Sequence, residues 1–214
     1  MQYKQILKLF LAVLVAHVTF PLMAQVAPDA IQGGIPIVAG AGVSNFIIDW
    51  GDNPDGHPRQ MQGITVWVDW NFYHAPGLLS GLGVEVEGRD IDWDLPPSLS
   101  NAALSDTGTN MRQDTGLGGV IYTLRRYRKI HPYAKALSGI GSIDFQPLTS
   151  AALYYRHDSR AIAATGAGVE YRVGRNIWVR GDYEYQWWPD LFGRQKALTP
   201  NGGTLGVVYH FGPR

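Results

Sequence analysis

Residues 165–188 read TGAGVEYRVGRNIWVRGDYEYQWW, and this stretch decides the fold. On both sides of the short turn at 174–176, every second residue is apolar or aromatic, and most of the residues between them are glycine, charged or polar. A period of two is the signature of β-strands with one apolar and one polar face. The apolar face of the second half ends in Tyr183, Tyr185 and Trp187, whereas the other face carries Arg180 and Glu184. This arrangement is typical of a hairpin in a membrane-spanning β-barrel.

The same alternation recurs along the chain. It predicts strands at 37–46, 63–72, 81–92, 115–124, 132–143, 165–173, 177–188 and 203–211. Each is close to the roughly 9–11 residues that a tilted strand needs to cross a bilayer. The sequence therefore predicts an all-β fold, an eight-stranded antiparallel up-and-down transmembrane β-barrel over residues 35–214. In such a barrel the last strand pairs with the first, and no strand edge stays free.

The connections between these strands alternate between long and short. Barrels of the outer-membrane type have short periplasmic turns and longer external loops. We therefore expect four external loops, at about 49–61, 93–114, 144–161 and 188–201. The fifth strand has an ambiguous pattern, and we expect Lys135 to point into its interior because a charged side chain is costly against lipid.

The N-terminus indicates secretion. Residues 1–24 contain Lys4 and Lys8, a short apolar run at 9–18 and small residues up to Ala24, which is the pattern of a secretory signal peptide. The alternative is a membrane anchor, although the apolar run is short for a permanent helix. Residues 25–34 are expected to form a flexible periplasmic segment. The chain has no cysteine, which excludes disulfides and thiolate metal sites.

The charge balance argues against a nucleic-acid partner. Removal of residues 1–24 takes away two lysines and no acidic residue, which leaves 16 basic against 18 acidic residues and a net charge of about −2. Nucleic-acid binders carry a basic face instead. The length that remains suits a single domain.

Three stretches carry a resemblance to a known family. The closing stretch GTLGVVYHF (203–211), together with the signal peptide and eight amphipathic strands, resembles small outer-membrane barrels of the OmpA/OmpX/opacity-protein type. The stretches HPYAKALSGIGSIDF (131–145) and VRGDYEYQWW (179–188) resemble the outer membrane β-barrel domain of porin-family proteins. The resemblance implies the outer membrane as the location, with outer-membrane lipid and the barrel-assembly machinery as partners. It also implies that an external ligand or surface meets the loops.

Aromatic residues gather near the predicted strand ends. A girdle of such residues is expected where a barrel meets the two membrane surfaces. The alternative is a platform that stacks a ligand. The predicted girdle consists of Trp50, Trp70, Tyr73, Tyr127, Tyr185, Trp187, Trp188, Tyr209 and Phe211.

Charged residues of both signs are predicted to point into the barrel, because they occupy the face opposite the apolar one. Counting along the strands puts several of them at one height, where Glu85 and Arg180 meet across the axis. Buried charges are tolerated when they are paired. The alternative is a wet channel in which each charge is solvated separately. The predicted ion-pair network consists of Asp69, Glu85, Glu87, Arg89, Lys135, Glu170, Arg172, Arg180, Asp182 and Glu184.

Two further motifs favour solvated loops over chemistry. Three acidic residues in the first loop do not have the spacing of a calcium-binding loop; they are Asp49, Asp52 and Asp55. His157, Asp158 and Ser159 are the residue types of a hydrolytic triad, and some eight-stranded barrels act as lipid A esterases. Adjacent residues on a flexible loop rarely reach triad geometry, however. We expect no catalytic residue, no metal site and no cofactor.

These observations predict a barrel with a structural or surface-interaction role, such as adhesion or recognition, and a lumen plugged by ion pairs. A barrel of eight strands is just wide enough for its own side chains to fill. The alternatives are a narrow pore for ions or small solutes, and an enzyme that modifies outer-leaflet lipid. A soluble lipocalin-like barrel is disfavoured by the signal peptide, the aromatic strand ends and the alternation of loop lengths.

Overall fold

A computed structural model describes residues 37–48, 59–72, 81–93, 109–124, 129–147, 156–190 and 197–211, all within the compact unit Ile35–Arg214. The expected signal peptide (1–24), the periplasmic segment (25–34) and the three acidic residues of the first loop lie outside the described residues. So do Trp50, Tyr73 and Tyr127 of the predicted girdle. Within the described ranges, no helix is long and apolar enough to cross a membrane.

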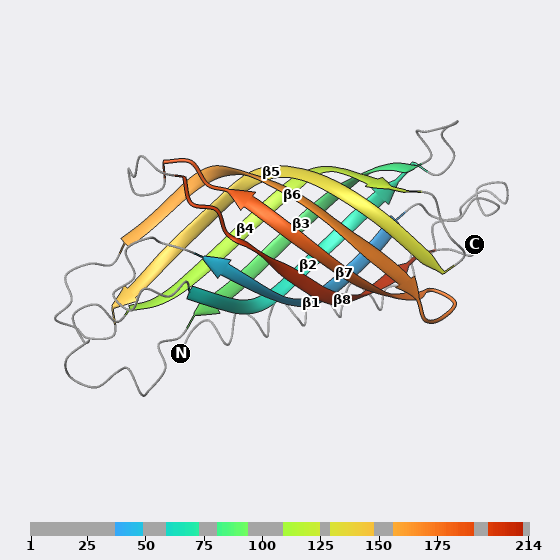
Figure 1. Ribbon diagram of the computed structural model, residues 1–214, viewed down its shortest axis with the longest axis horizontal. Helices are drawn as coiled ribbons and strands as arrows, with labels where there is room; N and C mark the ends of the chain where they lie inside the picture. The colour runs from blue at the N-terminus through green and yellow to red at the C-terminus, as the bar shows by residue number, and fades with distance from the viewer. Residues whose placement is uncertain are drawn as a thin grey trace, which may run out of the picture. The chain divides into compact units, whose positions relative to one another are not determined.

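The described part of the chain forms eight β-strands in a closed antiparallel barrel. They are β1 (Ile37–Ile48), β2 (Arg59–Asn71), β3 (Leu82–Trp93), β4 (Thr109–Thr123), β5 (Ile130–Pro147), β6 (Arg156–Arg172), β7 (Ile177–Trp187) and β8 (Asn201–His210). Each strand pairs with the next one in sequence, and β8 pairs with β1 to close the ring. Figure 1 shows the steep slant of the strands. The predicted fold class, an eight-stranded up-and-down barrel, is confirmed.

Side chains alternate between the interior and the outer face of the barrel. On β7, Arg180 and Glu184 are buried, whereas Ile177 and Tyr183 are exposed. Lys135 on β5 points inward and is 4 % exposed, as its charge predicts. The middle of the outer face is apolar and contains many exposed valine and isoleucine side chains, as a lipid-facing surface requires.

The predicted loops were too long, because several strands continue beyond the expected ends. β2 begins at Arg59, β4 at Thr109 and β6 at Arg156, and β5 continues to Pro147. The predicted loops 49–61, 93–114 and 144–161 therefore overlap with strands. The loop 188–201 is shortened by Asn201, the first residue of β8.

The extended strand ends reverse the polarity of the two faces, which explains the error. Here Met61, Met111 and Ile162 point inward and are almost fully buried, whereas Gln60 and Arg112 occupy the outer face. An apolar interior with a polar exterior is the pattern of a water-soluble barrel. The alternation expected of a lipid-facing strand is inverted here, so these outward polar residues were predicted to lie in loops. The barrel therefore has a lipid-facing part and a part with a polar exterior.

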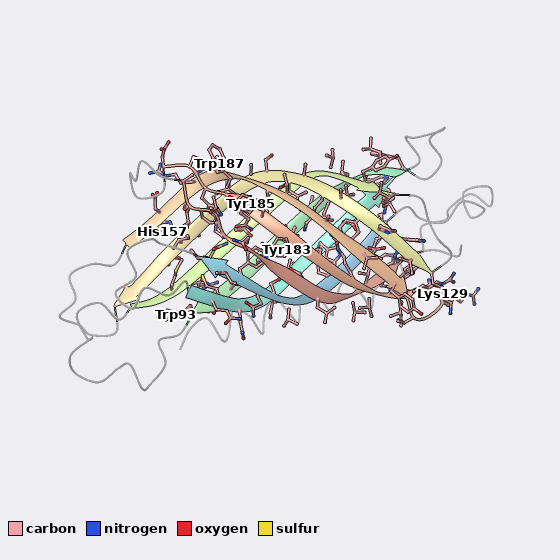
Figure 2. The ribbon with its side chains drawn as sticks, viewed as in Figure 1. Trp93, Lys129, His157, Tyr183, Tyr185 and Trp187 are labelled. Carbon is pink, nitrogen blue, oxygen red and sulfur yellow. The ribbon has the colours of Figure 1, made fainter. Side chains whose placement is uncertain are left out.

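Five residues of the predicted aromatic girdle lie on the outer face in the described strands. They are Trp70, Tyr185, Trp187, Tyr209 and Phe211, each 42–56 % exposed. Figure 2 shows Tyr183, Tyr185 and Trp187 following one another along β7. The prediction was wrong for Trp188, which is 0 % exposed and points inward. The alternation that turns Trp187 outward turns its neighbour into the lumen.

Candidate functional site

Arg180 lies at the centre of a layer of charged side chains inside the barrel. Its Nη2 donates to Glu85 Oε2 at 2.6 Å and its Nη1 to Asp69 Oδ2 at 3.1 Å. Its Nε donates to the Tyr133 hydroxyl at 2.6 Å. The guanidinium also lies 4.8 Å from the centre of the Trp67 ring. Because β7 and β3 lie opposite each other in a ring of eight strands, the contact between Arg180 and Glu85 crosses the lumen.

Lys135 on β5 contacts the carboxylates on the other side of this layer. Its ammonium lies 2.6 Å from Glu87 Oε2 and 2.9 Å from Glu184 Oε2. Longer contacts reach Glu85 Oε1 at 3.3 Å and Asp182 Oδ2 at 3.6 Å. Lys135 therefore connects β5 to both β3 and β7, and it shares Glu85 with Arg180.

Arg89 on β3 completes the layer. Its Nη1 donates to Glu184 Oε1 at 2.9 Å, and its Nη2 donates to Glu87 Oε1 at 2.5 Å. Its Nε donates to the Thr65 hydroxyl at 3.0 Å. The guanidinium lies 4.0 Å from the centre of the Phe46 ring, so it also touches the apolar side chains that fill the next part of the lumen.

Eight of the ten side chains in the predicted network are joined by these contacts. They are Asp69, Glu85, Glu87, Arg89, Lys135, Arg180, Asp182 and Glu184. The other two make different contacts. Arg172 donates to the carbonyl oxygens of Gly174 and Arg175 in the turn after β6. Glu170 lies 3.3 Å from His210 Nε2. Glu170 is the direct cross-strand partner of Arg180 in the β6–β7 ladder, but its carboxylate contacts His210 and not a cation of this layer.

The network contains five carboxylates and three cations, and all eight side chains are almost completely removed from solvent. A buried charge without a partner is costly, whereas a charge with several hydrogen bonds is tolerated. Each cation here faces at least two carboxylates. The excess of acidic groups means that a lumen opened at this layer would attract cations.

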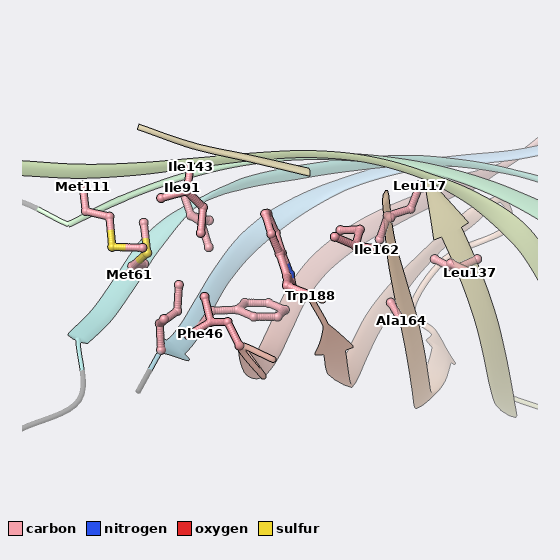
Figure 3. Close-up of a cluster of buried hydrophobic side chains, with 12 residues drawn as sticks. Phe46, Met61, Ile91, Met111, Leu117, Leu137, Ile143, Ile162, Ala164 and Trp188 are labelled. Carbon is pink, nitrogen blue, oxygen red and sulfur yellow. The ribbon is translucent and has the colours of Figure 1, made fainter. Parts of the chain in front are cut away.

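An apolar cluster fills the lumen beyond the charged layer, toward the ends where the long loops begin (Figure 3). Its members are Phe46, Ile48, Met61, Ile91, Met111, Leu117, Leu137, Ile143, Ile162, Ala164, Trp188 and Leu198. Gln186 joins this cluster to the charges, because it accepts from Trp188 Nε1 at 2.8 Å and donates to Glu184 Oε1 at 2.9 Å. Sequence reading missed this cluster, since it expected the whole interior to be polar.

A third layer occupies the other end of the lumen. It contains the buried apolar side chains Val38, Trp67, Trp178 and Val208. The ring of Trp178 lies near the rings of His131, at 4.3 Å, and His210, at 4.9 Å.

A second feature that the sequence did not predict is a chain of hydroxyls, in which Ser44 Oγ lies 2.7 Å from Thr204 Oγ1 and 2.5 Å from Thr65 Oγ1. The interior therefore carries charged, apolar, aromatic and hydroxyl side chains.

A separate polar cluster lies on the outer face of β5 and β6. His157 Nδ1 lies 2.5 Å from Asp144 Oδ1, and His157 Nε2 lies 3.1 Å from Ser159 Oγ. The expectation that His157 lies on a flexible loop was wrong, because it pairs with Asp144 within the β5–β6 ladder. Asp158, the acidic residue next to His157 in sequence, points to the other face, 3.1 Å from Arg160. Figure 2 shows His157 near the end of the barrel where the long loops begin.

Residues 10–211 match the family model described as the outer membrane protein β-barrel domain. The chain belongs to this family. As a member of the outer membrane β-barrel family, it is a transmembrane β-barrel of the outer membrane. No curated protein matches the chain significantly.

Solved structures of the same architecture resemble this family member. Neisserial surface protein A, NspA, is 13 % identical, with a TM-score of 0.62, over 84 % of this chain and 99 % of NspA. Ail, the attachment invasion locus protein of Yersinia pestis, is 15 % identical, with a TM-score of 0.54, over 82 % of this chain and 97 % of Ail. At these identities the likeness shows the fold alone. Within the described residues of this barrel, no group of three His, Asp or Glu side chains is arranged to hold a metal ion.

Proposed function

We propose that this chain is a non-conducting outer-membrane barrel with a structural or surface-interaction role, whose lumen is plugged by its own side chains. The observation that carries the proposal is the contact between Arg180 and Glu85 across the lumen, at 2.6 Å. An open pore requires a water-filled path, and here both partners of this bridge are excluded from solvent. The alternative, a wet channel in which each charge is solvated separately, is disfavoured by the same burial.

The apolar cluster supports the same proposal independently. Its side chains fill the lumen in series with the charged layer, so a solute that passed one layer would meet the other. Eight-stranded barrels have interiors just wide enough to be filled in this way. A narrow pore remains the second candidate function, because polar side chains line part of the interior.

The surface role rests on the part of the barrel with a polar exterior. It presents Asp90, Asp92, Arg112 and Asp114 on the outer face, near the ends where the long loops begin. Ail is named for attachment and invasion and has been solved with a heparin analogue, which illustrates how such a barrel can meet an external ligand. We propose outer-membrane lipid and, during assembly, the barrel-assembly machinery as further partners. The interior is proposed to have no enzymatic role.

Solute uptake by cells tests the plug. In a strain without its major porins, the wild-type protein is expected to leave the uptake of a small hydrophilic solute unchanged. Removing both partners of the central bridge, with Glu85→Ala and Arg180→Ala, should open the charged layer only. Adding Trp188→Ala to that pair should open both layers, and uptake should then rise, more for cations than for anions.

The matched control is the exposed pair of Asp90→Ala and Arg112→Ala, which lies on the outer face and should not change uptake. The gel shift on boiling confirms that each variant is folded before its uptake is compared. Raised uptake by cells with the wild-type barrel would make the protein a pore. A folded triple variant as impermeable as the wild type would show that these layers do not close the lumen.

A further inference from the structure

Asp144, His157 and Ser159 form a connected chain of an acid, an imidazole and a hydroxyl. The Asp144 carboxylate can only accept a hydrogen bond, so the contact of 2.5 Å assigns the proton to His157 Nδ1. His157 Nε2 is then an acceptor, and it faces the Ser159 hydroxyl at 3.1 Å. A nucleophile within hydrogen-bond reach of a base, and a base oriented by a third group, is the geometry of an activated serine.

The β5–β6 ladder fixes this geometry. Asp144 and His157 are direct cross-strand partners. Ser142 and Ser159 form the next cross-strand pair whose side chains face outward, which we call the next outward rung of the ladder. Residues two apart on a strand share a face, so the imidazole and the Ser159 hydroxyl point to the same side. Paired strands are more rigid than a loop, and rigid elements hold catalytic groups more precisely.

The surroundings indicate where an ester would lie. The outward rung below Ser142 and Ser159 joins Ile140 and Ala161, which are both exposed, and it belongs to the apolar band of the outer face. The rung above carries Asp144 and His157 and is polar. Ser159 therefore stands at the boundary between an apolar surface and a polar one. An ester with an acyl chain on the apolar side and an alcohol on the polar side fits this boundary.

We propose that Ser159 and His157, with Asp144 as the positioning residue, form a serine hydrolase site on the outer face that cleaves carboxylic esters. This goes beyond the proposed plug and surface role, and it uses a face of the barrel that the plug does not. An acyl ester of an outer-leaflet lipid is one source of the substrate, and a soluble ester is the other.

The proposed reaction has two steps, the acylation of Ser159 and its deacylation by water. Ser159 Oγ attacks the ester carbonyl carbon and passes its proton to His157 Nε2. The bond between carbon and the alkoxy oxygen then breaks, and His157 returns that proton to the departing oxygen, which releases the alcohol and leaves an acyl group on Ser159. Water attacks this acyl group, His157 takes the proton of the water, and the carboxylic acid leaves as Ser159 regains its proton. Ser142 is the cross-strand partner of Ser159 and shares its face, and its hydroxyl is the proposed donor of a hydrogen bond to the oxyanion.

The experiment uses the purified, folded, full-length barrel in lipid vesicles. Hydrolysis is measured on two substrates, the acyl esters of the vesicle lipid and soluble p-nitrophenyl butyrate. Ser159→Ala is expected to lower the rate by about 10⁶-fold, because it removes the nucleophile. Asp144→Asn is expected to lower it by about 10⁴-fold, as when the orienting carboxylate of a serine protease becomes an amide. Ser142→Ala should lower it by about 10²-fold.

The matched control is Ser138→Ala, an exposed serine on the same face of β5 and two outward rungs away, which should keep the wild-type rate. A fluorophosphonate probe should attach to Ser159 with loss of fluoride, and tandem mass spectrometry locates it. Activity on lipid alone would assign an outer-leaflet substrate, and activity on the soluble ester would assign a solution-facing one. Equal rates for the wild type and Ser159→Ala on both esters, with no probe on Ser159, would overturn the proposal.

Discussion

Arg180→Ala is expected to lower the free energy of unfolding by about 3–5 kcal/mol, because it removes one partner from a buried charged network. Arg180 is 1 % exposed, and its guanidinium contacts the carboxylates of Asp69, Glu85 and Asp182. Without it, Asp69 loses the cation it contacts, and Glu85 keeps only Lys135. The change is measured by urea unfolding of the folded barrel in lipid vesicles, with the gel shift on boiling as the readout.

Arg112→Ala is the matched control for this prediction. Arg112 also contacts two carboxylates, those of Asp90 and Asp114, but its side chain is 43 % exposed on the outer face. Exposed ion pairs contribute only about 0–1 kcal/mol, because water and salt screen them. A similar loss for both variants would mean that the charged layer is solvated and that the lumen contains water.

Trp188→Ala is expected to lower the free energy of unfolding by about 3–5 kcal/mol as well, for a different reason. Trp188 is fully buried in the apolar cluster and covers Gly141, where an added Cβ would lie 2.3 Å from its ring. Its removal leaves a cavity that the closed ring of strands cannot collapse to fill. The measurement is again urea unfolding in vesicles.

Trp187→Ala provides the comparison, because the neighbouring tryptophan lies on the other face of the same strand and is 50 % exposed. Its removal exposes no cavity inside the barrel, and lipid can fill the space that it leaves. We expect less than half the loss seen for Trp188→Ala. If Trp187→Ala proved the more costly change, the apolar cluster would not be the stabilising core of the barrel.

The transmembrane part of the fold could be predicted from sequence because lipid imposes a strict pattern. Ile64, Val66 and Val68 face out on β2, and Thr65 and Asp69 face in, as a period of two requires. Central positions such as Glu85 and Arg180 could be placed at one height by counting residues from the periplasmic turns. Glu170 also lies at this height, as the cross-strand partner of Arg180, but counting along a strand does not say which group its carboxylate contacts, and it contacts His210. Arg172, the last residue of β6, donates to carbonyl oxygens of the following turn instead.

The part with a polar exterior could not be predicted, because its two faces follow the opposite rule. Met111 and Ile143 are buried in the lumen, and the polar residues next to them in sequence were predicted to lie in loops. For the same reason, Asp144 and His157 were placed on a loop, although they are a cross-strand pair. The buried positions of these extensions mix single apolar residues, Met61 and Met111, with polar ones such as Gln113, so no apolar period of two marks them in the sequence.

The conductance of the purified wild-type barrel in a planar lipid bilayer shows whether its side chains close the lumen. The gel shift on boiling first establishes that the inserted protein is folded. We expect a nearly silent membrane, without steady current steps, because the charged layer and the apolar cluster block the lumen in series. A large and steady conductance from the folded wild-type protein would contradict it.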